Sequence, residues 1–140
     1  MSVAAQRNRR TLGATATIAL GLFCTGCSQV FWRPDLGGAM RMAGQRNQVV
    51  LVAYWSALNE DCMRMDREVF TDDQVVETLR GVVPVKLSTL TSQRFAEDYG
   101  LTTVPSFVIF GPEGQVLRTS AGYMDEASFR GMVQAAKMSL

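Results

Sequence analysis

The chain has 140 residues, of which 47% are hydrophobic, and this size and composition fit a single domain with a real core. Histidine is absent, which excludes imidazole bases and histidine-ligated metal sites. The net charge is only +1 and no basic block follows the first ten residues, so nucleic acid binding is not expected.

Residues 1–27 have the layout of an export signal. Three arginines lie in the first ten residues, an apolar run over residues 12–23 follows, and small residues come next. The tripeptide Thr25-Gly26-Cys27 resembles the end of a bacterial lipobox, in which Cys27 would be acylated and become the mature N-terminus. We therefore expect a lipoprotein held at the membrane of the bacterial cell envelope, facing the periplasm or exterior. An uncleaved membrane anchor and a cleaved, soluble exported protein are the alternatives.

The three cysteines have different expected fates. If Cys24 is removed with the leader and Cys27 carries lipid, Cys62 remains alone and cannot form an internal disulfide. Export would permit disulfides, so the only bridge open to Cys62 is one to another molecule.

Residues 28–35 are expected to form a short tether, and residues 36–140 a single domain. A continuous apolar run over residues 48–54 is typical of a buried central strand, and Asp35 can cap the helix that precedes it. In chain order, the pattern predicts helix 36–46, strand 48–54, helix 59–70, helix 71 or 72 to 80, strand 82–87, helix 92–99, strands 106–110 and 115–119, and helix 125–138. This alternation predicts an α/β fold with a mixed central sheet and helices on both faces.

Two motifs carry a resemblance to a known family. Tyr54-Trp55-Ser56-Ala57-Leu58-Asn59-Glu60-Asp61-Cys62 follows the first strand, and Val104-Pro105 opens a later one. The chain resembles the thioredoxin superfamily, in which a strand ends in aromatic-Trp-Ala-x-Trp-Cys-x-x-Cys and a Val-Pro or Ile-Pro opens a later strand. The resemblance covers about residues 36–138 and implies a thioredoxin-like fold of the periplasmic, disulfide-reductase type. It places Trp55 on the first Trp, Cys62 on the second Cys, and Asn59 where the first Cys stands.

Asn59 changes the chemistry that the resemblance implies. An amide is no nucleophile toward sulfur, so the dithiol cycle cannot run. Asn is, however, among the best helix N-cap residues, and Glu60 and Asp61 would then favour the helix dipole. The same two carboxylates would disfavour a thiolate at Cys62. We expect Asn59 to cap a helix, with a polar contact to substrate as the alternative.

Two further departures from the family pattern point the same way. Leu58 stands where a Trp is common, and Ala53 stands where the family often carries a buried acid. Lys86 falls on the position of the lysine that neighbours this acid, and it is therefore expected to have lost its partner.

The second motif implies a binding scaffold. The resemblance implies that Pro105 is a cis proline facing the site and that the backbone there pairs with an extended substrate chain. Gly122 matches the family glycine after the last strand. The expected binding residues are Trp55, Asn59, Val104 and Pro105.

We expect an exported, redox-degenerate thioredoxin-like protein that needs no cofactor and binds polypeptide or a partner protein in the envelope. Cys62 then belongs to a core stripe with Met65 and Val69 at helical spacing. The first alternative is a disulfide oxidoreductase that uses Cys62 as its single catalytic thiol. The second is a Cu(I) carrier using methionines such as Met63. No metal site is expected, because copper carriers of this fold use a Cys pair and a His.

Overall fold

The computed structural model describes residues 29–140. The predicted leader, with Cys24 and Cys27, lies outside these residues, so export and lipidation stay predictions. In the part described, no helix is long and apolar enough to cross a membrane.

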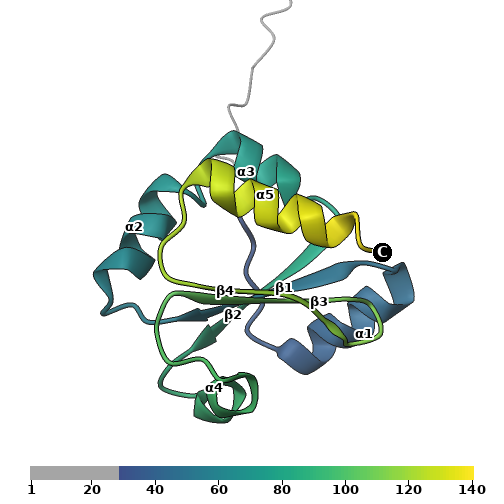
Figure 1. The fold of residues 1–140 in the computed structure, drawn as a ribbon, viewed down its shortest axis with the longest axis horizontal. Helices are drawn as coiled ribbons and strands as arrows, with labels where there is room; N and C mark the ends of the chain where they lie inside the picture. The colour runs from purple at the N-terminus through teal and green to yellow at the C-terminus, as the bar shows by residue number, and fades with distance from the viewer. Residues whose placement is uncertain (1–28) are drawn as a thin grey trace, which may run out of the picture.

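The elements follow the expected order (Figure 1). They are α1 (Leu36–Arg46), β1 (Val49–Trp55), α2 (Glu60–Glu68), α3 (Asp73–Thr78), β2 (Val82–Ser88), α4 (Gln93–Tyr99), β3 (Ser106–Phe110), β4 (Val116–Ala121) and α5 (Glu126–Lys137). The strands form one sheet in the order β2-β1-β3-β4. β1 runs parallel to β2 and antiparallel to β3, which is antiparallel to β4. The predicted mixed sheet is thus confirmed.

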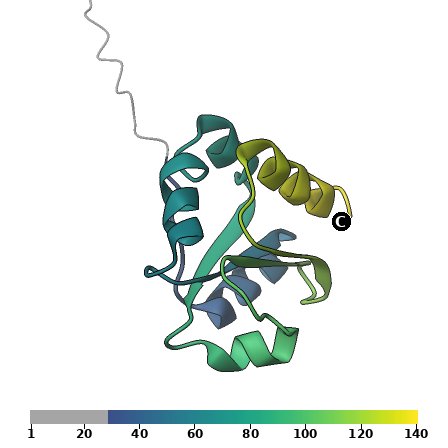
Figure 2. The same cartoon turned by 60° about the vertical axis from the view of Figure 1, so that its left-hand side comes forward.

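Helices cover both faces of the sheet, with α2, α3 and α5 on one side and α1 and α4 on the other (Figure 1, Figure 2). Because side chains alternate along a strand, β1 supplies two separate clusters. Leu51, Ala53 and Trp55 pack beneath α2 and α5. Val52 and Tyr54 pack against α1 and α4. Burial on both faces explains why β1 reads as a continuous apolar run.

Polar side chains begin most of the helices. Asp35, Asn59, Asp72 and Asp125 each accept a hydrogen bond from a backbone N–H in the first turn that follows. Asp72, not Thr71, is therefore the cap of α3. Local chemistry sets where these helices start, and the start of α2 positions the site.

Part of the predicted tether lies against the domain. The Arg33 N–H donates to the carbonyl of Pro84 at 2.9 Å, and the Lys86 N–H donates to the carbonyl of Arg33 at 2.9 Å. Val30 is buried in the core, and the Trp32 ring packs edge-on against Phe70 with centroids 4.9 Å apart. This segment covers the outer edge of β2, which would otherwise offer unpaired backbone groups.

Candidate functional site

The first motif lies where β1 ends and α2 begins. Trp55 closes the strand, and Asn59 takes an extended backbone conformation just before the helix. The Asn59 side-chain oxygen accepts a hydrogen bond from the Cys62 N–H at 3.0 Å. The expectation that Asn59 caps this helix is confirmed. Its amide oxygen is therefore already engaged in a hydrogen bond to the first turn of α2.

Cys62 is fully buried, with an exposed fraction of 0%. It packs in one cluster with Trp55, Met65 and Val69, so the predicted core stripe is confirmed. Burial raises the pKa of the Cys62 thiol, and the charges of Asp66 and Asp61 raise it further. A backbone hydrogen bond from Ser56 and the charge of Lys86 lower this pKa, but the net shift is upward. The thiol is therefore neutral at neutral pH.

The Asn59 cap gives the first testable prediction. Replacing Asn59 with Ala leaves the Cys62 N–H without its acceptor, and we expect the free energy of unfolding to fall by about 1 kcal/mol. Ser92 is a matched control, because it begins α4 without a side-chain cap hydrogen bond. Ser92→Ala should cost much less when both are measured by urea unfolding. Equal costs would show that the Asn59 hydrogen bond contributes nothing.

Lys86 has a partner, which corrects the expectation that it had lost one. Its ammonium lies 2.7 Å from a carboxylate oxygen of Asp66 on α2. The other oxygen of Asp66 accepts a hydrogen bond from the Trp55 indole N–H at 3.2 Å. An acid is thus present beside this lysine, but a helix supplies it instead of β1.

Sequence reasoning missed Asp66, although a signal existed. Asp66 comes four residues after Cys62, which puts both on nearly the same side of α2. Ala53 is the register partner of Lys86 across β1 and β2. The acid that pairs with Lys86 comes instead from α2, where the carboxylate of Asp66 lies 2.7 Å from the ammonium.

Aromatic rings surround the Lys86 ammonium. Its nitrogen lies 4.5 Å from the ring centroid of Trp55, 4.8 Å from that of Trp32 and 5.6 Å from that of Phe70. These distances permit cation–π attraction to each ring. The Lys86 side chain is only 23% exposed, and the Asp66 carboxylate and these rings together stabilise its positive charge there.

The second motif contains the cis proline that the resemblance implies. The Val104–Pro105 peptide bond is cis, and Pro105 is buried. The carbonyl of Pro105 accepts a hydrogen bond from the N–H of Gly122 at 2.8 Å, and Gly122 has a φ of 90°, which favours glycine. Within residues 29–140, neither the N–H nor the C=O of Val104 takes part in a backbone hydrogen bond. Both groups therefore lack a backbone partner in this part of the chain.

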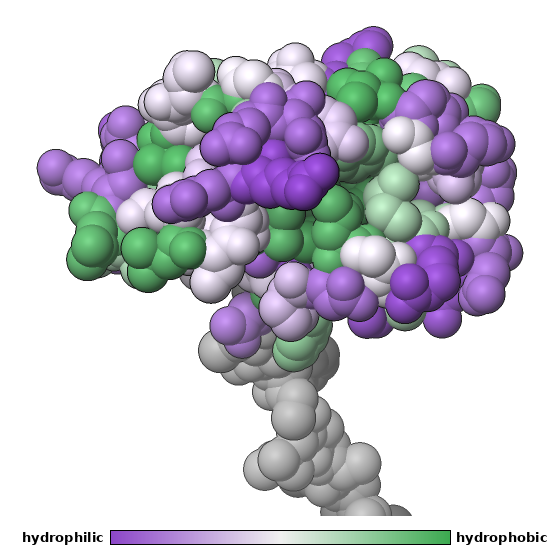
Figure 3. Space-filling view, turned by 90° about the horizontal axis from the view of Figure 1, so that it is seen from below, coloured by the Kyte–Doolittle hydropathy of each residue, from purple (hydrophilic) through white to green (hydrophobic). Residues whose placement is uncertain are grey.

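Two leucines project from the same end of the molecule. Leu58, in the loop before α2, is 93% exposed, and Leu90, in the loop before α4, is 82% exposed. Figure 3 shows apolar surface at the end where these two loops lie. These two side chains are apolar groups that a neighbouring molecule could contact at this end of the domain.

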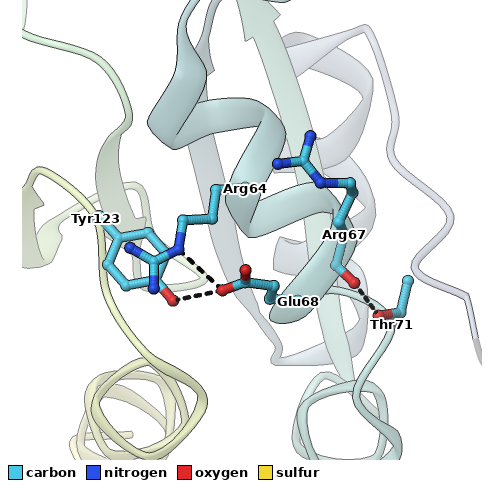
Figure 4. A network of polar contacts seen from close by, with 5 residues as sticks. All are labelled: Arg64, Arg67, Glu68, Thr71 and Tyr123. Atoms are coloured by element: carbon cyan, nitrogen blue, oxygen red, sulfur yellow. Dashed lines mark hydrogen bonds and ion pairs between the residues drawn. The ribbon is translucent and has the colours of Figure 1, made fainter.

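A polar network ties α2 to the loop after β4 (Figure 4). The Arg64 guanidinium lies 2.9 Å from the Glu68 carboxylate and 4.1 Å above the Tyr123 ring. The Tyr123 hydroxyl donates to the same carboxylate at 3.2 Å. Because Tyr123 follows Gly122 directly, the network holds the loop that contacts Pro105 in place relative to α2.

Carboxylate and thiol ligands for a metal do not cluster in the part of the chain that the structure describes. No three Cys, Asp or Glu side chains there gather closely enough to hold an ion. Met63 is partly exposed while Met65 is fully buried, so their two sulfurs do not share a surface. The geometry gives the Cu(I) alternative no support.

Residues 36–137 match the family model of a thioredoxin-like domain. A thioredoxin from Thermus thermophilus is similar, with 22% identity, a TM-score of 0.71, and coverage of 79% of this chain and 89% of that chain. No curated protein matches the sequence.

Two further solved structures are similar. One is a putative disulphide-isomerase from Bacteroides thetaiotaomicron, at 19% identity and TM-score 0.69, covering 80% of this chain and 96% of that chain. The other is a DsbH oxidoreductase, at 14% identity and TM-score 0.63, covering 96% of each chain. At these identities the likeness establishes the fold.

Proposed function

The chain belongs to the thioredoxin-like domain family, and from that premise we propose that it is an exported binding protein that has lost dithiol catalysis. Its ligand would be an extended polypeptide segment of a partner in the bacterial cell envelope. Its membrane attachment would come from lipid on Cys27.

One observation carries the loss of catalysis. Asn59 stands in the motif where the family places its attacking cysteine, and its side chain is occupied as a helix cap. Cys62, the only thiol among residues 29–140, is buried and free. A neutral thiol without access to solvent cannot attack a disulfide, because the thiolate is the nucleophile. The single-thiol oxidoreductase alternative would need Cys62 to reach its substrate, and the burial of Cys62 weighs against that.

Binding is supported by groups that survive around the site. The backbone N–H and C=O of Val104 can pair with an extended chain, as an added strand does at a sheet edge. Leu58 and Leu90 provide exposed apolar contacts at the same end of the molecule. Backbone pairing would give affinity for any extended segment, and the leucines would favour apolar side chains.

The catalytic half of the proposal is tested by insulin reduction with dithiothreitol. The full chain in detergent, with Cys24→Ser and Cys27→Ser, should give no turnover above the uncatalysed rate. Adding Asn59→Cys restores a Cys-x-x-Cys spacing with Cys62, and we expect weak turnover from that variant. Appreciable turnover before Asn59 is changed would overturn the proposal.

The binding half is tested with reduced, carboxymethylated insulin B chain, an extended peptide that offers no disulfide. The Leu58→Asp, Leu90→Asp variant should bind it at least about 10-fold more weakly by fluorescence anisotropy, because it loses two apolar contacts. Met138→Asp is the matched control, since Met138 is 85% exposed on the C-terminal segment. Equal affinity in both variants would place binding elsewhere.

A further inference from the structure

A pocket of about 270 Å³ lies beside Trp55. It is formed where the segment before α1 meets the ends of β1 and β2. Its lining residues are Trp32, Arg33, Pro34, Trp55, Ala57, Lys86 and Ser88. A volume of this size suits a small molecule, since pockets for larger ligands run to roughly 300–1,000 Å³.

The lining combines two indoles with two positive charges. Trp32 and Trp55 both lie within 5 Å of the Lys86 ammonium, at 4.8 and 4.5 Å from ring centroid to nitrogen. Arg33 adds a second cation, and no carboxylate lines the pocket. Asp66, the partner of Lys86, lines a neighbouring cavity instead.

Lys86 retains hydrogen-bonding capacity toward the pocket. An ammonium has three N–H donors, and Asp66 accepts one of them at 2.7 Å. The Ser88 hydroxyl oxygen accepts a hydrogen bond from the Leu90 N–H at 3.2 Å, which leaves its own O–H to donate. The polar part of the pocket therefore offers donors from Lys86, Arg33 and Ser88.

The charges decide which ligand fits. Aromatic walls often receive an organic cation, but here the ammonium of Lys86 already occupies the ring faces and would repel a second cation. An anion would be attracted to Arg33, and it could accept from the N–H groups of Lys86 that Asp66 does not use. A planar ring can pack against the indole edges beside the ammonium.

We propose that this pocket binds a small planar organic anion, with its carboxylate between Arg33 and Lys86 and its ring against the indole edges that the Lys86 ammonium leaves uncovered. The pocket adjoins the loops that carry Leu58 and Leu90, but neither leucine and no atom of Val104 lines it. It therefore does not depend on the polypeptide-binding function proposed above.

The proposal is tested by titrating the full chain in detergent with 2-naphthoate, followed by calorimetry. We expect saturable one-to-one binding, with affinity at least about 10-fold weaker for the neutral 2-naphthamide, because the amide loses the charge-assisted hydrogen bonds. Arg33→Gln should weaken 2-naphthoate binding by a similar factor while its backbone contacts to β2 remain. Lys86→Gln should do the same.

Arg94→Gln is the control, since Arg94 is an exposed cation on α4 that does not line the pocket. It should bind 2-naphthoate as the unmodified chain does. Equal affinity for acid and amide would overturn the proposal, and so would unchanged 2-naphthoate affinity in Arg33→Gln. If Lys86→Gln does not fold, the Arg33→Gln and amide comparisons still decide the question.

Discussion

Native Cys62 is expected to react with iodoacetamide at least about 10³-fold more slowly than the same thiol in the unfolded chain. The side chain has an exposed fraction of 0% and lies in the cluster beneath α2. Reagent can reach it only when the structure opens, and opening of a core helix costs a large part of the unfolding free energy. Burial also raises the pKa of the thiol, so little thiolate is present at neutral pH.

The measurement uses a chain with Cys24→Ser and Cys27→Ser, so that Cys62 is its single thiol. Alkylation is followed by mass spectrometry at neutral pH, with and without urea. A control chain carries Cys62→Ala and Met63→Cys on the same background, and position 63 is 45% exposed. That thiol should react in the native state nearly as fast as when unfolded. Rapid alkylation of native Cys62 would instead favour the single-thiol oxidoreductase.

Replacing Asp66 with Leu is expected to lower the free energy of unfolding by about 2 kcal/mol. The substitution leaves Lys86 among aromatic rings without its carboxylate, and it removes the acceptor of the Trp55 indole N–H. The loss is smaller than for a fully buried pair, because the Asp66 side chain is 43% exposed and the Lys86 side chain 23%.

A second substitution tests whether the cost comes from the unpaired lysine. Adding Lys86→Met should recover at least half of the lost stability, since an apolar side chain can fill the space without an uncompensated charge. Glu77→Ala serves as the control, because it breaks the exposed Glu77–Arg80 pair and should cost at most about 0.5 kcal/mol. Urea unfolding is measured for the unmodified chain, Asp66→Leu, the double variant and Glu77→Ala. If Asp66→Leu costs no more stability than Glu77→Ala, the Asp66–Lys86 pair does not stabilise the fold.

Local chemistry in the sequence accounts for much of the fold. Asp35 and Asn59 cap helices as expected. Each side-chain oxygen accepts from a backbone N–H only two or three residues further on, so the local sequence is enough to predict the cap. The apolar run of β1 predicts a strand buried on both faces, and the spacing of Cys62, Met65 and Val69 predicts a core stripe. Each of these inferences needs only neighbours in the chain.

Other features were decided by tertiary structure alone. Lys86 meets Asp66 across 20 residues, and Arg33 pairs with the edge of β2, because the packing of one element on another sets those distances. The outward projection of Leu58 and Leu90 depends equally on how their loops leave the sheet. A periodic pattern states which face of a helix or strand is apolar, but not which polar group on a neighbouring element will come within hydrogen-bonding reach. For that reason the sequence predicted the framework of this site, whereas the charge pair and the pocket beside Trp55 emerged only from the folded chain.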